Sequence, residues 1–162
     1  DGFTYWSHLS GKDKVILDGD FIRLNKLSGD AEKQTVVSLQ LMAGGPVAVA
    51  DQYSTIGGDT RFYTNDELLA LNADRFVGKP LSDQLNSPDS NIWYGTMSDG
   101  SYVVGLFNRG DSSQSFDVAL SRFGIDGEMN QRDLWSHTDE GRVSAVKATV
   151  PAHGCKIVKL TK

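Results

Sequence analysis

Three aspartates in the sequence stand directly after short apolar runs. Asp18 and Asp20 follow the run Val15–Leu17, and Asp51 follows the run Val47–Ala50. Because Asp18 and Asp20 are two residues apart, their side chains point the same way in an extended backbone. Ionised carboxylates accept charge-assisted hydrogen bonds from hydroxyl groups, such as those of a sugar. The three aspartates are therefore candidates for binding a hydroxyl-rich ligand.

The same aspartates also have a structural interpretation. Asp side chains commonly accept hydrogen bonds from the backbone of their own turn. Gly19, between Asp18 and Asp20, allows the chain to bend sharply. From the pattern alone both interpretations stay open for Asp20, whereas the structural one is favoured for Asp18 and Asp51.

Three tryptophans are candidates for another kind of contact. The rings of Trp6, Trp93 and Trp135 could stack on the apolar side of a pyranose, although a buried packing anchor is the more common use. A carbohydrate-binding module with Trp93 or Trp135 as its stacking platform is one alternative function. A purely structural sandwich used for protein contacts is another.

The remaining reactive residue types form no recognisable site. His8, His137 and His153 lie far apart and lack metal-ligand spacing. Cys155 lies beside apolar residues and is expected to be a small core residue. Arg109-Gly110-Asp111 spells an adhesion tripeptide, but it is expected to form a turn. We expect neither a metal nor a cofactor.

Charge and composition argue against several classes of function. The 162-residue chain has a formal net charge of −5 and no basic cluster, which disfavours nucleic acid or an anionic membrane as a partner. No apolar run approaches the roughly 20 residues of a membrane-spanning helix. The chain begins at Asp1, without a Met or a signal-peptide stretch, so either a segment was removed or the chain is a piece of a longer protein. The rest of the sequence favours a piece.

The first half of the sequence alternates short apolar runs with helical patterns. The runs Val15–Leu17 and Val47–Ala50 suit strands that are buried on both faces, and helices are expected over Asp30–Ala43 and Asn65–Ala73. A strand, a crossover helix and a second strand form a right-handed parallel unit. Since two parallel strands cannot cover their own faces, we expect the other strands of this sheet to come from elsewhere.

Both predicted helices carry capping signals. Ser28 or Asp30 can cap the first helix, and Gly44-Gly45-Pro46 ends it. Thr64, with Glu67 three residues later, predicts a capping box at the second helix.

The second half of the sequence has the pattern of short antiparallel strands. Ile92–Met97 and Tyr102–Phe107 flank Asp99-Gly100, which predicts a hairpin with a type I′ turn. Further strands are expected at about 115–120, 131–135, 143–150 and 156–160. Six short strands with turn signals between them are typical of an antiparallel β-sandwich.

A polar stretch separates the two patterns. Residues 78–90 are interpreted as a domain connection, with one long loop as the alternative. We therefore divide the chain into an α/β segment, residues 1–80, and an all-β antiparallel sandwich, residues 81–162.

A resemblance to a known family covers roughly residues 14–162. It rests on the segments Leu41–Asp51, Asn65–Asn72, Ile92–Tyr94, Ser98–Arg109, Arg132–Trp135 and Pro151–Gly154. In this order they are similar to the last barrel strand, the helix after it and the C-terminal sandwich of glycoside hydrolase family 27, the α-galactosidase family.

The resemblance implies a (β/α)₈ barrel followed by an antiparallel sandwich, and retaining hydrolysis by two aspartates. Those two residues lie upstream in the family, so this chain is expected to hold no catalytic residue. Asp18-Gly19-Asp20-Phe21 looks like the counterpart of the family's Trp-Asn-Asp-Pro-Asp-Met motif, in which the later Asp contacts the sugar. Asp20 would inherit that role, with Asp18 and Asp51 as further substrate-binding candidates.

This motif also differs from the family pattern. No Trp-Asn precedes Asp18, and Gly19 and Phe21 replace Pro and Met. A relative that acts on α-glucans such as dextran therefore stays open as an alternative. In either case the resemblance implies the C-terminal part of a retaining α-glycosidase, which is inactive alone and whose sandwich braces the barrel. Its partners would be a carbohydrate substrate and the N-terminal catalytic part, and we expect a secreted or periplasmic location.

Overall fold

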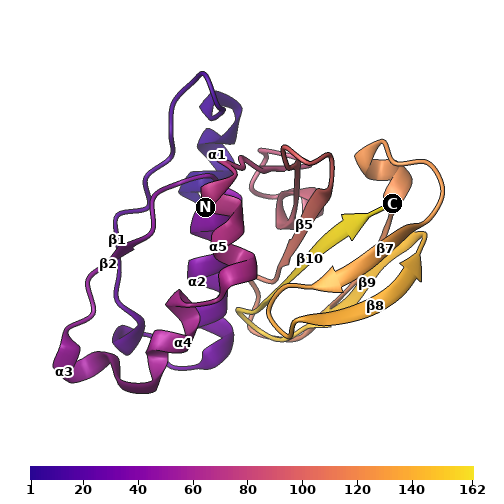
Figure 1. Cartoon of the computed structure of the whole chain (residues 1–162). Coiled ribbons are helices and arrows are strands. Elements are labelled where there is room, and N and C mark those ends of the chain that lie inside the picture. Colours follow the sequence, from indigo (N-terminus) through magenta and orange to yellow (C-terminus); the bar gives the residue numbers. More distant parts are fainter.

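The change of pattern along the sequence corresponds to two parts of the structure. The computed structural model describes residues 1–162, and its longer helices lie to one side of its main β-sheet (Figure 1). The first part comprises α1 (Gly2–Trp6), β1 (Phe21–Ile22), α2 (Asp30–Met42), β2 (Ala48–Val49), α3 (Tyr53–Ile56), α4 (Thr60–Tyr63) and α5 (Asp66–Ala73), with the 3₁₀ turns η1 (Ser7–Leu9), η2 (Leu24–Lys26) and η3 (Gly57–Asp59). The second part comprises β3 (Lys79–Pro80), β4 (Ile92–Thr96), β5 (Tyr102–Phe107), β6 (Gln114–Ala119), β7 (Met129–Asp133), β8 (Thr138–Val143), β9 (Ala145–Val150) and β10 (Cys155–Thr161), with the 3₁₀ turns η4 (Pro88–Asn91) and η5 (Leu120–Phe123).

β1 and β2 form the expected parallel pair, but they are shorter than predicted and the first is displaced. The prediction of a strand over Val15–Leu17 is wrong, because Val15 makes only a single bridge to Ser10 and is 56% exposed. A strand needs a neighbour for its backbone groups, and no strand of this chain pairs with that run. The run Val47–Ala50 yields only the two residues of β2, and Val49 is exposed rather than buried.

Both predicted helices form, but their caps differ from the predicted ones. No side chain caps α2, contrary to the prediction for Ser28 and Asp30. At α5 the cap is Asn65 rather than Thr64, because the Asn65 side-chain oxygen accepts a backbone N–H of the first turn. The Asn65 amide also donates to the carbonyl of Leu134, at 2.8 Å. A contact to the second part of the chain therefore selects the cap.

The second part forms the expected antiparallel sandwich. Six strands make one sheet in the order β3-β4-β5-β10-β7-β8, and β6 pairs with β9 in a separate two-stranded sheet. All neighbouring strands in both sheets are antiparallel. Residues 78–90 are not one long loop, because β3 pairs with β4 at the edge of the large sheet and η4 leads into β4. The fold class read from the sequence, an α/β segment followed by an antiparallel sandwich, is confirmed.

Two details of the sandwich differ from the sequence prediction. In the β4–β5 hairpin only Gly100 has a positive φ, +83°, and its N–H donates to the Met97 carbonyl. The connection is therefore a three-residue loop that ends in a left-handed glycine, not a type I′ turn. The predicted strand over 143–150 divides, since Val143 ends β8 and Ala145 begins β9. β8 escaped prediction because its residues are mostly exposed and lack an apolar alternation.

Each face of the six-stranded sheet packs against a different layer. On one face, Val104 and Val158 share a core with residues of β6 and β9. On the other face, Val103 and Ile157 share a core with residues of α2 and α5. Alternate residues of β5 therefore enter different cores, which explains why Tyr102–Phe107 is a nearly continuous apolar run.

The segment before β1 packs closely against α2. A Cβ atom at Gly19 would lie 2.5 Å from Nε2 of Gln40 and 2.6 Å from Cζ of Phe3. Gln40 is buried, and its Nε2 donates to the carbonyl oxygen of Asp20 at 3.3 Å. The chain therefore needs glycine at position 19 for close packing, whereas the positive φ of this turn, +63°, belongs to Asp20.

A network of charged groups joins α5 to the β7–β8 hairpin. Arg132 donates from Nε and Nη2 to the two carboxylate oxygens of Glu67, at 2.9 and 2.7 Å, and from Nη1 to Asp139 at 2.9 Å. Nδ1 of His137 lies 2.8 Å from the Glu67 carboxylate. The hydrogen bonds from Arg132 lower the pKa of Glu67 to about 2, against the opposing effect of burial and with help from His137. An ionised Glu67 therefore holds the two parts of the chain together.

Replacement of Glu67 by Gln should lower the free energy of unfolding at pH 7 and weaken its dependence on acid. Because folding depresses the pKa of Glu67, the stabilisation is full above the ordinary glutamate pKa of about 4.3 and is lost as the pH falls toward 2. Urea unfolding at pH 7 and pH 3 measures both effects. Glu128→Gln is the control, since Glu128 pairs with Arg142 on the exposed surface. An equal loss of stability in the two variants at pH 7 would contradict the role given to Glu67.

Replacement of Gly19 by Ala should lower the free energy of unfolding by about 1–3 kcal/mol, because the new methyl group overlaps the buried Gln40 amide and the ring of Phe3. Gly58→Ala is the matched control, because a Cβ there meets nothing within 4 Å and the residue lacks a positive φ. We expect the control to change stability by less than about 0.5 kcal/mol. Thermal unfolding of the two variants makes the comparison, and equal stability would show that the close approach at Gly19 is relaxed at no cost.

Candidate functional site

Asp18 and Asp20 lie together in the exposed turn that precedes β1. The Asp18 Oδ1 accepts the backbone N–H of Asp20 at 2.8 Å, and the Asp20 Oδ1 accepts the N–H of Phe21 at 2.9 Å. Each carboxylate therefore accepts a backbone hydrogen bond of the turn with one of its oxygens, as the structural interpretation requires. The second oxygen of each accepts no hydrogen bond from the chain, so both carboxylates remain able to accept one from a ligand.

The buried amide of Gln40 supports this turn from the side of α2. Besides donating to the Asp20 carbonyl, it has a buried Oε1 with no hydrogen-bond partner in the chain. Sequence reasoning missed Gln40. Its signal was a polar residue between Leu39 and Leu41 on a helix that is otherwise apolar at this point.

Asp51 lies apart from the other two aspartates. In the β1–β2 register Phe21 pairs with Ala48, so Asp20 is level with Val47, four residues before Asp51. Asp20 and Asp51 therefore do not meet at the same edge of the parallel pair. The reason is that β1 begins only after Asp20, whereas Asp51 follows the end of β2.

The Asp51 carboxylate is fully engaged within the chain. It accepts the N–H groups of Leu24 and Asn25, at 2.9 and 3.2 Å, and the hydroxyl of Tyr63, at 2.7 Å. Burial opposes its ionisation, but these hydrogen bonds outweigh burial and hold the pKa of Asp51 below its ordinary value. Burial and the nearby Asp51 raise the pKa of Tyr63 well above its ordinary value, so Tyr63 stays a donor. The sequence gives no signal for this Tyr63 contact.

An aromatic ring lies beside the Asp18–Asp20 turn. A hollow of about 320 Å³ is lined by Trp6, Phe3 and Leu17 together with Asp18 and Gly19. Trp6 is 50% exposed. An exposed indole next to a carboxylate combines an apolar surface for a sugar ring with an acceptor for its hydroxyls.

Of the other two tryptophans, Trp93 lies in the core and Trp135 packs against it. Trp93 is 1% exposed and donates from its indole nitrogen to the carbonyl of Ser90 at 3.2 Å, so it cannot stack on a ligand. Trp135 is partly buried and donates to the hydroxyl of Ser38 at 2.8 Å. Its ring packs edge-to-face against Phe62, with 6.0 Å between ring centroids.

The other reactive residues take structural positions. The Arg109 guanidinium donates to Asn91, Asp1, Leu85 and Ser90, so the adhesion tripeptide does not offer its arginine to a partner. Cys155 is partly buried beside the Ser38 hydroxyl, and burial raises the pKa of its thiol to about 11. No group of three His, Cys, Asp or Glu residues is placed to hold a metal ion. No helix combines the length and apolarity needed to cross a membrane.

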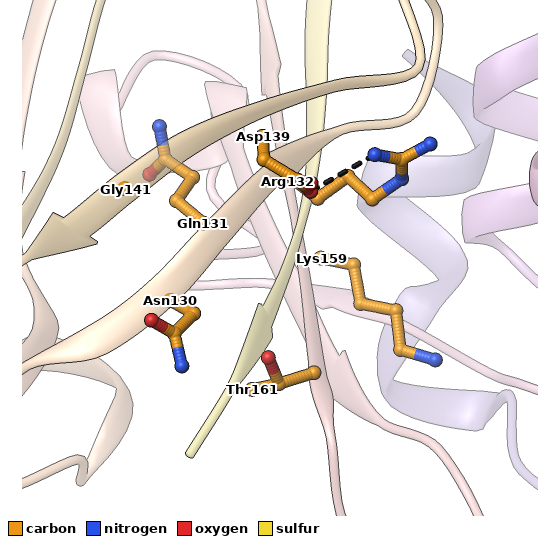
Figure 2. A pocket seen from close by; sticks show the side chains of 7 residues that line it. All are labelled: Asn130, Gln131, Arg132, Asp139, Gly141, Lys159 and Thr161. Atoms are coloured by element: carbon orange, nitrogen blue, oxygen red, sulfur yellow. Dashed lines mark hydrogen bonds and ion pairs between the residues drawn. The ribbon is translucent and has the colours of Figure 1, made fainter.

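A polar hollow on the sheet does not match a sugar platform. It measures about 520 Å³ and lies over β7, β8 and β10 (Figure 2). Its cationic side chains already have partners, since Arg132 binds Asp139 and Lys159 binds Asp99 at 3.1 Å. The lining contains no aromatic ring and consists of Asn130, Gln131, Arg132, Asp139, Gly141, Lys159 and Thr161.

Comparisons with known proteins agree with this architecture. Residues 87–160 match the family described as the alpha galactosidase C-terminal beta sandwich domain. The isomalto-dextranase of Arthrobacter globiformis is 41% identical over 99% of this chain, and the α-galactosidase of Coffea arabica is 29% identical over 80% of it. The chain spans only 26% and 35% of the lengths of these two proteins.

Solved structures extend the likeness to the α/β segment. The isomalto-dextranase of A. globiformis T6, in complex with panose, superposes with a TM-score of 0.88 at 40% identity, over 99% of this chain and 28% of that one. A family 27 β-L-arabinopyranosidase from Geobacillus stearothermophilus shares the fold, with a TM-score of 0.82 at 21% identity, over 98% of this chain and 40% of that one. The chain is therefore similar, over nearly its whole length, to the C-terminal portion of family 27 glycoside hydrolases, an α/β segment followed by the antiparallel sandwich.

Proposed function

We propose that this chain is the C-terminal part of a retaining α-glycosidase that acts on an α-glucan such as dextran. One observation supports this substrate class most directly. The likeness to an isomalto-dextranase extends over almost the whole chain, at higher identity than the likeness to the α-galactosidase of coffee. Hydrolysis of terminal α-galactosides is the second candidate, and the α-galactosidases among the relatives support it.

We divide the chain, in this proposal, into the end of a (β/α)₈ barrel, residues 1–80, and the sandwich, residues 81–162, although the last two residues of the first part form β3 and pair with β4 of the sandwich. The exposed apolar side chains of the α/β segment support the division. Phe21 and Val49 of the parallel strand pair are 69% and 49% exposed, and Ile16 before it is 65% exposed. Neighbouring barrel strands would cover such side chains, because parallel sheets are normally buried on both faces.

The catalytic pair belongs, in this proposal, to earlier barrel strands that the chain does not contain. Retaining hydrolysis needs two carboxylates about 5–5.5 Å apart across the scissile bond. Asp20 and Asp18 contribute to the sugar-binding rim instead. Asp20 accepts a sugar hydroxyl with its free oxygen, while Asp18 fixes the turn through the Asp20 N–H. Asp51 shapes the rim through the backbone of Leu24 and Asn25.

The sandwich braces the barrel segment. The buried contact between its outer face and α2, the Glu67–Arg132 pair and the hydrogen bond from Thr35 to the His153 carbonyl at 2.8 Å all support this role. Burial of Trp93 removes the main support for a carbohydrate-binding module built on that residue. We further propose a secreted or periplasmic location, because a polymer such as dextran does not enter cells.

Replacement of Asp20 by Ala in the complete glycosidase should lower kcat/KM by about 10–100-fold, since a hydrogen bond to a charged group is lost. Asp20→Asn is the matched variant, because Asn tolerates the left-handed backbone and still offers an oxygen to the Phe21 N–H while it lacks the charge. We expect a smaller loss for Asn. Assays on isomalto-oligosaccharides and on an aryl α-galactoside separate the two substrate classes. Unchanged kinetics in both variants would reduce Asp20 to a turn residue.

A further inference from the structure

A third hollow lies at the seam between the helical part and the sandwich. It measures about 370 Å³, within the range of small-molecule pockets. Its walls come from the first turns of α2, from α4 and from the connection between β7 and β8. Its lining includes Asp30, Gln34, Arg61, Phe62, Trp135 and His137.

One wall of this seam hollow is an aromatic ring held in a fixed position. The Trp135 indole is tied at its nitrogen to Ser38 and at its edge to the buried Phe62. It therefore loses little further freedom when a ligand binds. Trp135 is the one tryptophan of the sandwich that is not fully buried.

The polar groups of the seam hollow keep free hydrogen-bonding capacity. The amide of Gln34 makes no hydrogen bond within the chain, so it offers two donors and an acceptor. Arg61 donates from Nη2 to Asp30 at 2.6 Å and lies over the ring of Phe62 at 4.7 Å, which leaves its other N–H groups unused. His137 contacts Glu67 through Nδ1 and keeps Nε2 free.

The charges around the seam hollow are balanced in pairs. Arg61 is paired with Asp30, and His137 faces the carboxylate of Glu67. No uncompensated cation is left to select a phosphate or a carboxylate ligand. A rigid aromatic wall, a free amide and paired charges match a neutral ring compound that carries many hydroxyl groups.

We propose that the seam hollow is a second carbohydrate site, which binds one or two sugar units of the α-glucan apart from the Asp18–Asp20 rim. The choice of an α-glucan rests on the proposed function. The two sites lie at different places on α2, since Gln40 supports the rim and Gln34 lines the hollow, about 9 Å along the helix axis. The second site holds the polymer on the protein without taking part in bond cleavage.

Affinity electrophoresis of the 162-residue chain in native gels that contain dextran tests the proposal directly. We expect dextran to retard the chain, galactomannan to leave its mobility unchanged, and the double variant Gln34→Ala/Arg61→Ala to weaken dextran binding at least 10-fold. Neither side chain belongs to a core cluster, so the variant should fold, and thermal unfolding confirms this. Arg142→Ala is the matched control, because Arg142 is similarly exposed, pairs with a carboxylate and lies outside the hollow.

Trp135→Phe provides an independent variant, which keeps an aromatic ring but loses the tie to Ser38. We expect it to weaken retardation while the fold is retained. A cooperative thermal transition of the parent chain first establishes that it is folded. The proposal is then overturned if the parent chain is not retarded, if galactomannan retards it as much as dextran does, or if the double variant is retarded as strongly as the parent. Retardation that is lost in Asp20→Ala and kept in the double variant would also overturn it.

The same variants in the complete glycosidase separate this proposal from the proposed function. With both correct, the double variant loses activity on long dextran but not on isomaltotriose. Hydrolysis of isomaltotriose by a protein whose isolated chain shows no retardation refutes the second site and leaves the glycosidase assignment intact. Retardation by dextran in a protein that hydrolyses no α-glucan refutes the assignment and leaves the second site.

Discussion

Burial of the outer face of the six-stranded sheet against α2 is the contact on which the rest of the structure depends. Val103 and Ile157 of the sheet share one core with Leu41 and Met42 of the helix. Because these side chains interlock at close-packed density, α2 has one position relative to the sheet. The sandwich therefore fixes the positions of the side chains of α2, although the sandwich itself contains none of the candidate rim residues.

Three polar residues of α2 show how far this placement reaches. Ser38, which is buried, receives the indole N–H of Trp135, while Gln40 holds the turn of Asp20 and Gln34 opens into the seam hollow. A small rotation of α2 would disturb all three contacts together. The sandwich would therefore brace the barrel segment by fixing α2, the helix that supports both candidate sugar sites.

The sequence predicted well those elements whose signal is local. The helix over residues 30–42, the hairpin around Asp99-Gly100 and the strand over residues 145–150 depend on side chains that are close in sequence, and all three form. The failures have tertiary causes. The run Val15–Leu17 has strand composition but no neighbouring strand in this chain, and the α5 cap was decided by the Leu134 carbonyl. β8 carries no apolar alternation at all.

In the candidate site, too, features that depend on neighbouring residues could be predicted, and features that depend on tertiary packing could not. Asp18 and Asp20 lie in one turn because they are close in sequence, but the turn is not the extended backbone on which the expected side-chain direction depended, since Asp20 has a φ of +63°. The separation of Asp51 depends on strand register, and the contact of Gln40 depends on the packing of α2, so neither could be read from the spacing. The two interpretations of Asp20 also proved compatible. A carboxylate has two oxygens, and the turn uses one of them.

The two cores also differ in where their residues come from. This difference shows that the α/β segment depends on the sandwich for its buried interior. The core between the two sheets draws its buried residues only from residues 92–160, so this core forms within the sandwich, whereas the outer face of the large sheet needs the helices to cover it. The other core mixes residues of both parts, from Ile22 to Ile157, so the α/β segment has no separate interior. Its strand pair still exposes Phe21 and Val49.

Relatives with this fold act on different sugars, as the names isomalto-dextranase and β-L-arabinopyranosidase state. A sandwich that supports the proposed rim from outside would let rim residues change without loss of the fold, because specificity resides in the site and not in the fold.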